Sequence, residues 1–340
     1  MRVAAVVVSW NSAGQLPACL AALTGQTYPA FEVVVVDNAS VDASREVVAA
    51  AGGRATPVRL LARDTNRGFC GGVNDALAEL ADDVEAVLLV NPDVVADRDL
   101  VAHCVAALAA DPLRGSVQPR LLRPADGLRP AVVDTTGHEL TTSRIVRNRG
   151  EGGRPDADLT PAGEVFGASG ACVLHRRAML DDVTWPNGEV LTEDLVAYFD
   201  DVELDWRSRR RGWCAWYEPA ATAVHERGGS GPRRTPWVEA LNWSNHLLVT
   251  VTCDRIAPRH TPAYLGVGVL KTLELAATSP GGLVAGVRRL PLLVGAVRRR
   301  GWLRHRQQRT ATEVIEEWAR PTPWRAWVRG WWRRRQASSP

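Results

Sequence analysis

The stretch that decides the fold is Val87-Leu88-Leu89-Val90-Asn91-Pro92-Asp93, an apolar run that ends in a carboxylate. Consecutive apolar residues of this kind predict a strand buried on both faces, as in parallel sheets covered by helices. Pro92 ends the backbone pairing and stiffens the turn. Asp93 is then a candidate ligand for a hard divalent cation, Mg²⁺ or Mn²⁺, and an ordinary strand-end turn is the alternative.

Apolar runs of the same type alternate with helical periodicity through the first hundred residues. Strands are expected at 3–10, 31–36, 58–62 and 86–90, and helices at 42–51, 71–80 and 97–110. Ser40 or Asp42 is the expected cap of the helix at 42–51. The alternation predicts an α/β fold with a Rossmann-like, mostly parallel sheet flanked by helices. Ligands of such sheets bind beyond the carboxyl ends of the strands.

Polar side chains stand at those strand ends: Asn11, Asp37, Asn66 and Asp93. Asp37 can accept the ring N3–H of uracil or thymine, or it can simply help to cap the next helix. The turn Asn66-Arg67-Gly68-Phe69 enters a helix whose N-terminus favours anionic groups, and an ordinary turn is the alternative. The first strand–helix turn lacks a GxGxxG fingerprint, which argues against a nicotinamide dehydrogenase.

A carboxylate cluster opens a later helix in the stretch Tyr198-Phe199-Asp200-Asp201-Val202-Glu203. Crowded like charges are unfavourable unless they are solvated, bound to a metal or used in chemistry. Asp201 is therefore a candidate general base, and helix capping by acids is the alternative. Around this helix, expected at 201–211, we predict strands at 166–175 and 213–217. The segment 120–165 is predicted to form a hairpin or a mobile loop.

His225 ends a short apolar strand and precedes Gly228-Gly229-Ser230. It is a candidate for completing the metal site or contacting a diphosphate, whereas a lone histidine more often has a structural role. The glycine-rich turn is a weak candidate for phosphate binding.

The C-terminal region is helical after Pro236 and strongly basic: residues 281–340 hold fourteen Arg and three Glu, although the whole chain has a net charge of only +3. Leu283, Val287, Leu290, Val294 and Val297 recur at helical spacing, and Trp324, Trp327, Trp331 and Trp332 follow. This pattern is typical of an interfacial helix on an anionic membrane surface. Packing on the α/β domain, a homodimer seam and a nucleic-acid patch are the alternatives. We expect no nucleic-acid partner.

The chain shows no sign of a signal peptide or of an uninterrupted membrane-spanning stretch. Its six cysteines form no close CxxC pair, which indicates neither a zinc site nor a disulfide framework and fits a reducing compartment. Together with the basic tail, this predicts a cytoplasmic protein that is peripheral on the inner face of the plasma membrane.

Seven segments, taken in order, resemble family 2 glycosyltransferases of the GT-A fold, especially the rhamnosyltransferase-like branch that builds bacterial cell-surface polysaccharides. The matching segments are Val6–Asn11, Asp37–Ser40, Asn66–Phe69, Asn91–Asp93, Gly167–Ala171, Tyr198–Arg207 and His225–Ser230. The likeness covers residues 1–235. It implies a catalytic domain with a nucleotide-sugar half at 1–118 and an acceptor half at 119–235, followed by a helical, Arg- and Trp-rich region at 236–340.

The resemblance also implies roles for individual residues. Those implied to bind the nucleotide sugar are Ser9, Asn11, Asp37, Asn66, Gly68, Asn91 and Asp93. Asp93 and His225 would hold a divalent metal, and Asp201, with its neighbour Asp200, would carry the catalytic base. The residues implied to bind the acceptor are Gly167, Ala168, Ser169, Gly170, Trp206 and Arg207.

The expected function is inverting, metal-dependent transfer of one sugar from a nucleotide diphosphate to a glycan or polyprenyl-diphosphate-linked acceptor. The resemblance favours dTDP-rhamnose as the donor, with UDP-galactofuranose or another UDP-sugar as the alternative. The QxxRW signature of processive synthases is absent. A sugar nucleotidyltransferase would need a Gly- and Arg-rich N-terminal loop that this chain lacks. A non-catalytic, membrane-tethered GT-A-like scaffold remains the other alternative.

Overall fold

The computed structural model describes residues 1–51, 56–125, 131–155, 161–227, 235–256 and 258–322. The described strands of the main sheet are β1 (Arg2–Ser9), β2 (Phe31–Asn38), β3 (Val58–Arg63), β4 (Val84–Val90), β5 (Val94–Ala96), β6 (Arg114–Arg123), β7 (Val132–Thr135), β10 (Gly163–Val165), β11 (Cys172–Arg176) and β12 (Cys214–His225). A separate two-stranded ribbon pairs β8 (His138–Leu140) with β9 (Val146–Asn148).

The path of the main sheet runs β10-β12-β6-β11-β4-β1-β2-β3, with β5 and β7 attached to β12 and β6. Strands β4, β1, β2 and β3 are all parallel, so their carboxyl ends meet at one edge. Strand β11 enters antiparallel between β4 and β6. The sheet is therefore the mostly parallel, Rossmann-like sheet that the alternating pattern predicted, and its second half adds antiparallel strands.

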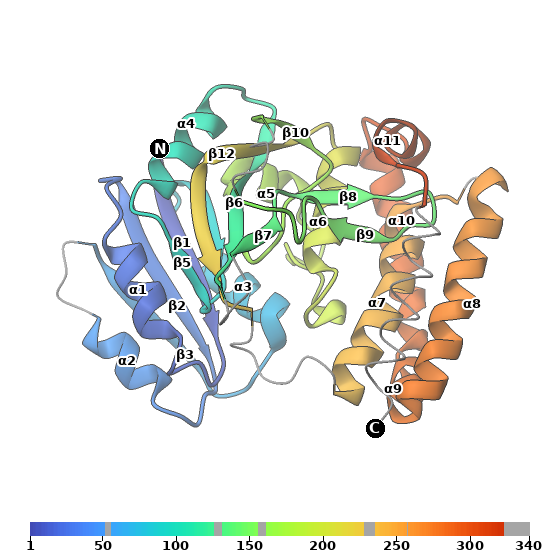
Figure 1. Ribbon diagram of the computed structural model, residues 1–340, viewed down its shortest axis with the longest axis horizontal. Helices are drawn as coiled ribbons and strands as arrows, with labels where there is room; N and C mark the ends of the chain where they lie inside the picture. Colours follow the sequence, from blue (N-terminus) through green and yellow to red (C-terminus); the bar gives the residue numbers. More distant parts are fainter. Residues whose placement is uncertain (52–55, 126–130, 156–160, 228–234, 257, 323–340) are drawn as a thin grey trace.

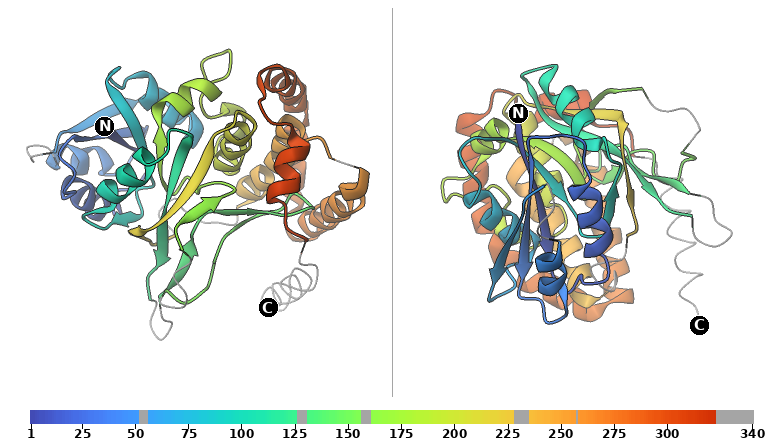
Figure 2. Two further views of the ribbon diagram at one scale, coloured as in Figure 1. Left: turned by 90° about the horizontal axis from the view of Figure 1, so that it is seen from above. Right: turned by 90° about the vertical axis from the view of Figure 1, so that its left-hand side faces the viewer.

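Helices cover both faces of this sheet (Figures 1 and 2). They are α1 (Leu16–Thr24), α2 (Ser44–Ala50), α3 (Gly68–Ala78), α4 (Leu100–Ala109), α5 (Arg177–Val183) and α6 (Asp200–Arg210). Because alternate residues of a strand face opposite sides, Val7 of β1 shares a core with α1 and α4, whereas Val6 shares one with α3 and α6. This double coverage explains why the strands are uninterrupted apolar runs.

The last part of the described chain is helical and packs beside the α6 side of the sheet (Figure 1). Its helices are α7 (Pro236–Cys253), α8 (Thr261–Thr278), α9 (Pro280–Arg288), α10 (Leu293–Arg306) and α11 (Ala311–Trp318), with short 3₁₀ turns at η1 (Glu193–Leu195), η2 (Pro258–His260) and η3 (Leu290–Leu292). Thr235 caps α7, and Thr310 with Glu313 forms a capping box on α11.

By length and composition alone, Pro280–Arg306 is the one stretch of the described helices that could cross a membrane, and 17% of its apolar window is buried. The sequence shows no uninterrupted stretch of this kind, because charged residues and prolines divide the apolar region 263–297. In the structure the helical turn η3 carries the chain through Pro291 and joins α9 to α10.

Two local predictions need correction. The strand expected at 166–175 begins only at Cys172, because residues 166–171 form a loop over α6. Helix α2 begins at Ser44 rather than at Asp42, with no side-chain cap. Asp42 instead accepts hydrogen bonds from Ser44 and from the backbone of Ala13, which ties α2 to the first strand–helix turn.

The hairpin that was one of the two predictions for segment 120–165 is confirmed in its described part, where β8 and β9 pair antiparallel.

Candidate active site

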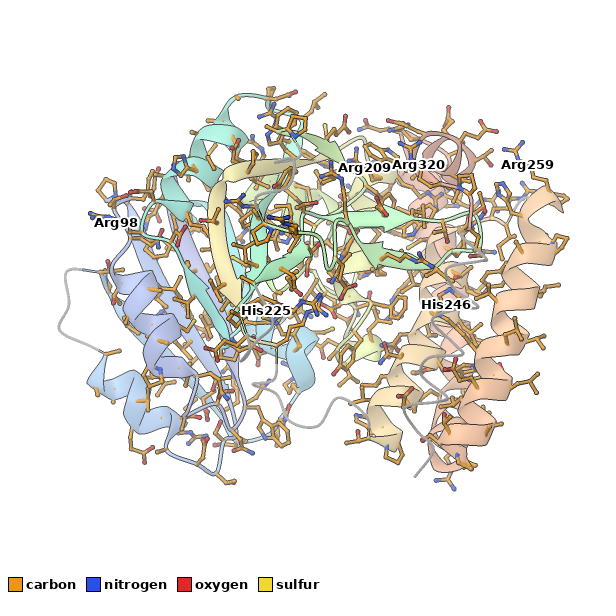
Figure 3. The ribbon with its side chains drawn as sticks, in the orientation of Figure 1. Arg98, Arg209, His225, His246, Arg259 and Arg320 are labelled. Atoms are coloured by element: carbon orange, nitrogen blue, oxygen red, sulfur yellow. The ribbon has the colours of Figure 1, made fainter. Side chains whose placement is uncertain are left out.

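The predicted metal ligands Asp93 and His225 contact each other. His225 is the last residue of β12 (Figure 3). Strand β5, directly after Asp93, pairs antiparallel with the last residues of β12, so that Val94 stands opposite His225. His225 Nε2 is 3.4 Å from Asp93 Oδ1. His225 Nδ1 donates a hydrogen bond to Asp134 Oδ2 at 2.8 Å. The imidazole is thus fixed between two carboxylates, with Nε2 turned toward Asp93.

Asp134 comes from β7 and is buried. Its other oxygen, Oδ1, forms ion pairs with Arg123 and Arg227. Burial lowers the pKa of His225, but its hydrogen bonds to Asp134 and Asp93 outweigh burial and raise the pKa above the ordinary value. This surrounding of paired charges makes a rigid support for a histidine that binds a ligand.

The predicted nucleotide-binding residues meet at the carboxyl ends of the parallel strands. Ser9 stands opposite Asp37 in the β1–β2 register, and both are buried. Asp37 Oδ2 accepts from Arg45 Nε at 2.6 Å and from the backbone of Ser40. Among the described residues, Asp37 Oδ1 and Ser9 Oγ have no hydrogen-bond partner. These oxygens, at the carboxyl ends of the strands, can therefore accept a hydrogen bond from a ligand, for example from the ring N–H of a nucleotide base.

The turns beside them are shaped by local hydrogen bonds. The Asn66 side chain accepts from the backbone of Gly68 at 2.8 Å, which orders the start of α3. Gly68 has φ of +73°, and a Cβ there would collide with Val196, so glycine is required. Asn91 is half-buried and donates its backbone N–H to Ala171 at 2.9 Å. Asn11 also has a positive φ, of 52°, and its side chain accepts from the backbone of Val41.

The carboxylate cluster opens α6, as predicted. Asp200 is buried, whereas Asp201 has 24% of its side chain exposed and is the more open of the two. Asp201 Oδ2 accepts from the backbone of Gly170 at 3.0 Å. It also lies 3.7 Å from His138 Nε2. Asp201 is thus held in place from two sides while one part of it stays accessible, as a base that meets a substrate requires.

A second buried histidine and carboxylate stand behind Asp201. His138 Nδ1 donates to Asp205 Oδ2 at 2.7 Å, and Asp205 Oδ1 accepts from the backbone of Ala168 at 3.0 Å. Although burial lowers the pKa of His138, the charge of Asp201 and the hydrogen bond to Asp205 raise it to about 9. Burial raises the pKa of Asp205, and the hydrogen bond to His138 opposes this.

The two neighbouring acids of α6 differ in burial, because Asp200 is buried and Asp201 is partly exposed. Burial and the charge of Asp201 raise the pKa of Asp200 to about 8. The protonated form of Asp200 is therefore favoured at neutral pH.

A strained loop positions the start of α6. Val196, Tyr198 and Phe199 all have φ values of 65–67°, a region that non-glycine residues rarely adopt. The side chain of Asn245, from α7, lies within hydrogen-bond distance of three carbonyls of this loop. Arg289, directly after α9, in turn donates to Asn245 at 2.9 Å. Backbone strain of this kind persists only where the surroundings hold it, and here the helical region does so.

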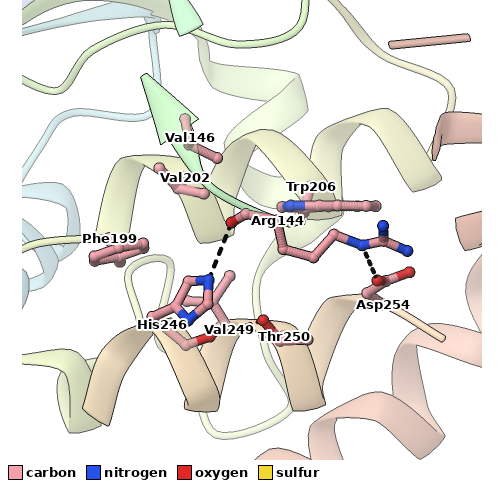
Figure 4. A pocket seen from close by; sticks show the side chains of 9 residues that line it. All are labelled: Arg144, Val146, Phe199, Val202, Trp206, His246, Val249, Thr250 and Asp254. Carbon is pink, nitrogen blue, oxygen red and sulfur yellow. Dashed lines mark hydrogen bonds and ion pairs between the residues drawn. The ribbon is translucent and has the colours of Figure 1, made fainter. Parts of the chain in front are cut away.

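Four predicted acceptor residues are not available to an acceptor. Arg207 is completely buried, and it binds Glu203 and the carbonyls of Val183 and Val190. Trp206 is buried against α7 and lines a cavity of only about 10 Å³ (Figure 4). Gly167 and Ala168 are buried as well, beneath Asp205. Trp206 and Arg207 lie in the part of α6, residues 202–210, that is buried throughout.

Only Ser169 and Gly170 of the predicted acceptor set are partly exposed. They lie in the loop that carries the Gly170–Asp201 hydrogen bond. The turn Gly228-Gly229-Ser230 and the tryptophans at 324, 327, 331 and 332 lie outside the described residues.

Sequence reasoning missed Asp134, His138, Asp205 and Asn245 as site residues. Asp205 is within the matching segment Tyr198–Arg207, and His138 follows a glycine in the segment expected to be a hairpin or a loop. Only the packing of β7 and β8 against the carboxylates revealed their partners, because more than sixty residues separate each pair.

The described residues contain no group of three or more His, Cys, Asp or Glu side chains arranged to hold a metal ion. Asp93 and His225 nevertheless form an oxygen–nitrogen pair whose histidine is oriented by a buried carboxylate. Mg²⁺ and similar ions commonly use one or two protein ligands and take the rest from water and substrate phosphates. The residues present therefore fit a divalent metal that shares its coordination with a diphosphate.

Comparison with known proteins identifies relatives in sequence. The model of the family described as glycosyl transferase family 2 matches residues 4–184. The chain is 28% identical over 245 residues to N-acetylglucosaminyl-diphospho-decaprenol L-rhamnosyltransferase of Mycobacterium tuberculosis, which covers 67% of this chain and 77% of the relative.

Solved structures share the fold. GalNAc-T7 with UDP, GalNAc and Mn²⁺ matches with a TM-score of 0.65 at 11% identity, over 93% of this chain and 56% of its own. A Pyrobaculum calidifontis mannosyltransferase with GDP-Man and Mn²⁺ matches with a TM-score of 0.53 at 19% identity, over 93% and 87% of the two chains. S. aureus TarS with UDP-GlcNAc matches with a TM-score of 0.53 at 17% identity, over 87% and 82%.

These structural likenesses confirm the expected GT-A fold with its helical C-terminal region. The family model covers more than half of the chain, and the sequence relative is a named rhamnosyltransferase. The protein belongs to glycosyl transferase family 2 and is a glycosyltransferase of the rhamnosyltransferase-like kind.

Proposed function

We propose that this glycosyltransferase is an inverting, metal-dependent enzyme that moves one sugar from a nucleotide diphosphate to a hydroxyl of a polyprenyl-diphosphate-linked glycan. One observation carries the proposal: a single loop joins the metal pair to the base. Asn91, two residues before Asp93, donates to the carbonyl of Ala171, and the adjacent Gly170 donates to Asp201. A diphosphate beside Asp93 and an acceptor hydroxyl beside Asp201 can then meet at one anomeric carbon.

In the proposed reaction the acceptor oxygen forms a bond to the anomeric carbon as the bond from that carbon to the diphosphate oxygen breaks. The electron pair of the broken bond leaves on the diphosphate. Asp201 takes the hydroxyl proton, and attack from the face opposite the leaving group inverts the configuration. A positioned base of this kind is worth about 10²–10⁴ in rate. Asp200, protonated at neutral pH, does not compete for the proton.

Asp93 and His225 are the residues that would hold the metal, and Asp134 fixes the imidazole of His225. A divalent ion bound there would neutralise charge on the departing diphosphate. Asp93 would face the phosphates from the end of the central strand, and His225 would approach from β12.

We assign residues 1–118 to donor binding, 119–235 to acceptor binding and 236–340 to a helical, membrane-associating region. For the donor we propose dTDP-rhamnose. The sequence relative from M. tuberculosis, a named L-rhamnosyltransferase, supports the sugar. The Asp37 oxygen that has no hydrogen-bond partner among the described residues supports a thymine or uracil base, because both bases present an N3–H. UDP-galactofuranose is the alternative donor.

The first test measures thermal shifts of the purified chain with dTDP-, UDP- and GDP-sugars, each with and without Mn²⁺. A ligand that binds the folded state raises its stability in proportion to the logarithm of its concentration. We expect a metal-dependent rise with dTDP-rhamnose that exceeds the rise with the matched GDP-sugar. Equal shifts for all three nucleotides would contradict the role of Asp37, and the absence of any shift would contradict the proposed donor site.

We also propose that the helical region binds the anionic inner face of the plasma membrane without crossing it. Apolar side chains on α8 are exposed: Leu265 by 56%, Val269 by 58% and Leu273 by 61%. Val284, Val287, Val294 and Val297 are exposed on α9 and α10, beside the exposed Arg288 and Arg298. An apolar face flanked by arginines favours an anionic lipid surface.

Other arginines of the same helices face the protein, which supports a peripheral arrangement. Arg299 donates to Asp194 at 2.7 Å, and Arg300 donates to the carbonyl of Asp254 at 2.5 Å. A helix that crossed the membrane would have to give up these bonds to the catalytic side of the molecule. Pro280–Arg306 is therefore better placed on the surface of the bilayer than through it.

Vesicle flotation tests this arrangement. The triple variant Leu265→Ser, Val269→Ser, Leu273→Ser should lose most binding to phosphatidylglycerol vesicles, whereas the exposed Val41→Ser in the donor half should not. Binding that the triple variant retains in full would remove α8 from the membrane contact.

A further inference from the structure

We propose that His138, held by Asp205, is a positioning residue that decides which of the two neighbouring acids of α6 is ionised. The inference rests on the proposed role of Asp201 as the base. It assigns a task to two buried groups that neither bind the donor nor touch the acceptor. Through His138, the proton shared by the acids is kept on Asp200, and Asp201 stays ready to accept the proton of the hydroxyl.

The first step of the argument is geometry. His138 Nδ1 is engaged by Asp205 at 2.7 Å, and its Nε2 lies 3.7 Å from Asp201 Oδ2. Both the ring and Asp205 are about 5% exposed or less. Because Nδ1 is engaged by Asp205, only Nε2 can interact with a further group, and the carboxylate that it faces is that of Asp201.

The second step is the way this arrangement is built. The backbone N–H of His138 donates to the carbonyl of Gly167 at 2.9 Å, which anchors β8 to the loop over α6. A Cβ at Gly167 would overlap the carboxylate of Asp205, so that only glycine leaves room for it. The same loop donates the backbone N–H of Ala168 to Asp205 and that of Gly170 to Asp201. One loop thus fixes both carboxylates relative to the histidine.

The third step is charge. The ionisable groups that act on His138 are Asp200, Asp201 and Asp205, all from α6. The loop 166–171 packed against them, Phe-Gly-Ala-Ser-Gly-Ala, contains no ionisable side chain. A cationic imidazole nearest to Asp201 favours the ionised form of that carboxylate over the ionised form of Asp200. The raised pKa of His138, about 9, keeps the ring charged through neutral pH.

The experiment compares pH profiles of kcat for the wild type, His138→Gln, His138→Asn and Asp205→Asn. Without the cation, the proton is shared with Asp201, so the acid limb of the profile should move to higher pH. On the acid limb itself, turnover at a fixed pH should fall about tenfold for each unit by which the limb moves. The deficit of the variants should shrink as the pH rises toward 9, because Asp201 then becomes ionised without the cation.

Controls separate this role from a merely structural one. Donor affinity measured by calorimetry should remain within twofold of the wild type in all three variants. His175→Gln, which replaces another buried histidine bonded only to Ser116 among the described residues, should leave the shape of the profile unchanged. If His138→Gln lowers kcat equally at every pH, or lowers it only as far as the folded fraction falls in a melting curve, the inference is overturned.

The Asp201→Asn variant distinguishes a failure of this inference from a failure of the proposed function. Full turnover of Asp201→Asn would remove the base itself. An inactive Asp201→Asn, combined with an unshifted profile in both His138 variants, would leave the base in place and remove only the role of His138.

Discussion

Two clusters of this molecule share one construction. In each, a histidine directs Nδ1 to a buried aspartate and Nε2 to a functional one: Asp134–His225–Asp93 at the end of the sheet, and Asp205–His138–Asp201 at the start of α6. The Nδ1 bonds are 2.8 Å and 2.7 Å, and the Nε2 separations are 3.4 Å and 3.7 Å. The clusters differ in what surrounds the buried aspartate.

Asp134 is flanked by Arg123 and Arg227, which already neutralise its charge. Asp205 forms no ion pair with an arginine among the described residues and relies on His138 and the backbone of Ala168. The carboxylates around each histidine raise its pKa, so the two rings differ mainly in how the charge of the buried aspartate is balanced. We propose that the same three residue types support a metal in the first cluster and a proton balance in the second.

The largest expected effect is the loss of turnover when the proposed base of the Asp205–His138–Asp201 cluster is replaced. Asp201→Asn keeps the shape of the side chain but cannot accept the hydroxyl proton, so turnover should fall by about 10²–10⁴. Donor affinity, measured by calorimetry with Mn²⁺, should stay unchanged because Asp93 and His225 are intact. Asp181→Asn, an exposed aspartate of α5, is the matched control. Normal turnover of Asp201→Asn would show that another group is the base.

The next largest effect is expected on the metal dependence of donor binding, in the Asp134–His225–Asp93 cluster. Asp93→Ala removes the proposed carboxylate ligand, so the gain in donor affinity on adding Mn²⁺ should disappear. Calorimetric titration with dTDP-rhamnose, in Mn²⁺ and in EDTA, measures that gain directly. A variant that still gains affinity with Mn²⁺ to the wild-type extent would place the metal elsewhere.

A smaller effect on metal affinity is expected when Asp134, the buried aspartate behind His225, is replaced. Asp134→Asn should lower metal affinity by about 10–100-fold, because such partners orient the ligating histidine and raise its basicity. Donor binding in EDTA should not change. Glu151→Gln, which alters a half-exposed carboxylate bonded to the same Arg227, is the control. Equal losses in both variants would point to a general disturbance around Arg227.

The sequence predicted the part of each cluster that we assign to the reaction and missed the part that supports it. Asp93, Asp201 and His225 follow recognisable strands or open a helix, so local pattern was enough to select them. Asp134 and His138 lie in a segment of weak periodicity, and each pairs with residues far away in the chain. Trp206 and Arg207 belong to a recognisable motif as well, but that motif continues into a part of α6 that is buried throughout.

The parallel arrangement of the strands was predictable in the first half, because uninterrupted apolar runs require coverage on both faces. In the second half, β11 and β12 insert beside β4 and β6 through long-range pairing that no local pattern specifies. The loop 166–171 illustrates the consequence. Its small apolar residues are typical of a buried strand, but Gly167 and Gly170 instead bring the backbone against two carboxylates of α6.

The smallest expected effect concerns stability and tests the division of labour between Asp200 and Asp201. The pKa of Asp200 is raised to about 8 in the folded chain, whereas in the unfolded chain it is near 3.9. The folded state therefore binds the proton more tightly, and the wild type loses stability as the pH rises between these two values. Asp200→Asn removes this loss and should raise the melting temperature at pH 7.5 by about 2–4 °C for each kcal/mol relieved. The difference should vanish near pH 4, and a constant difference at every pH would mean that Asp200 is ionised in the folded protein.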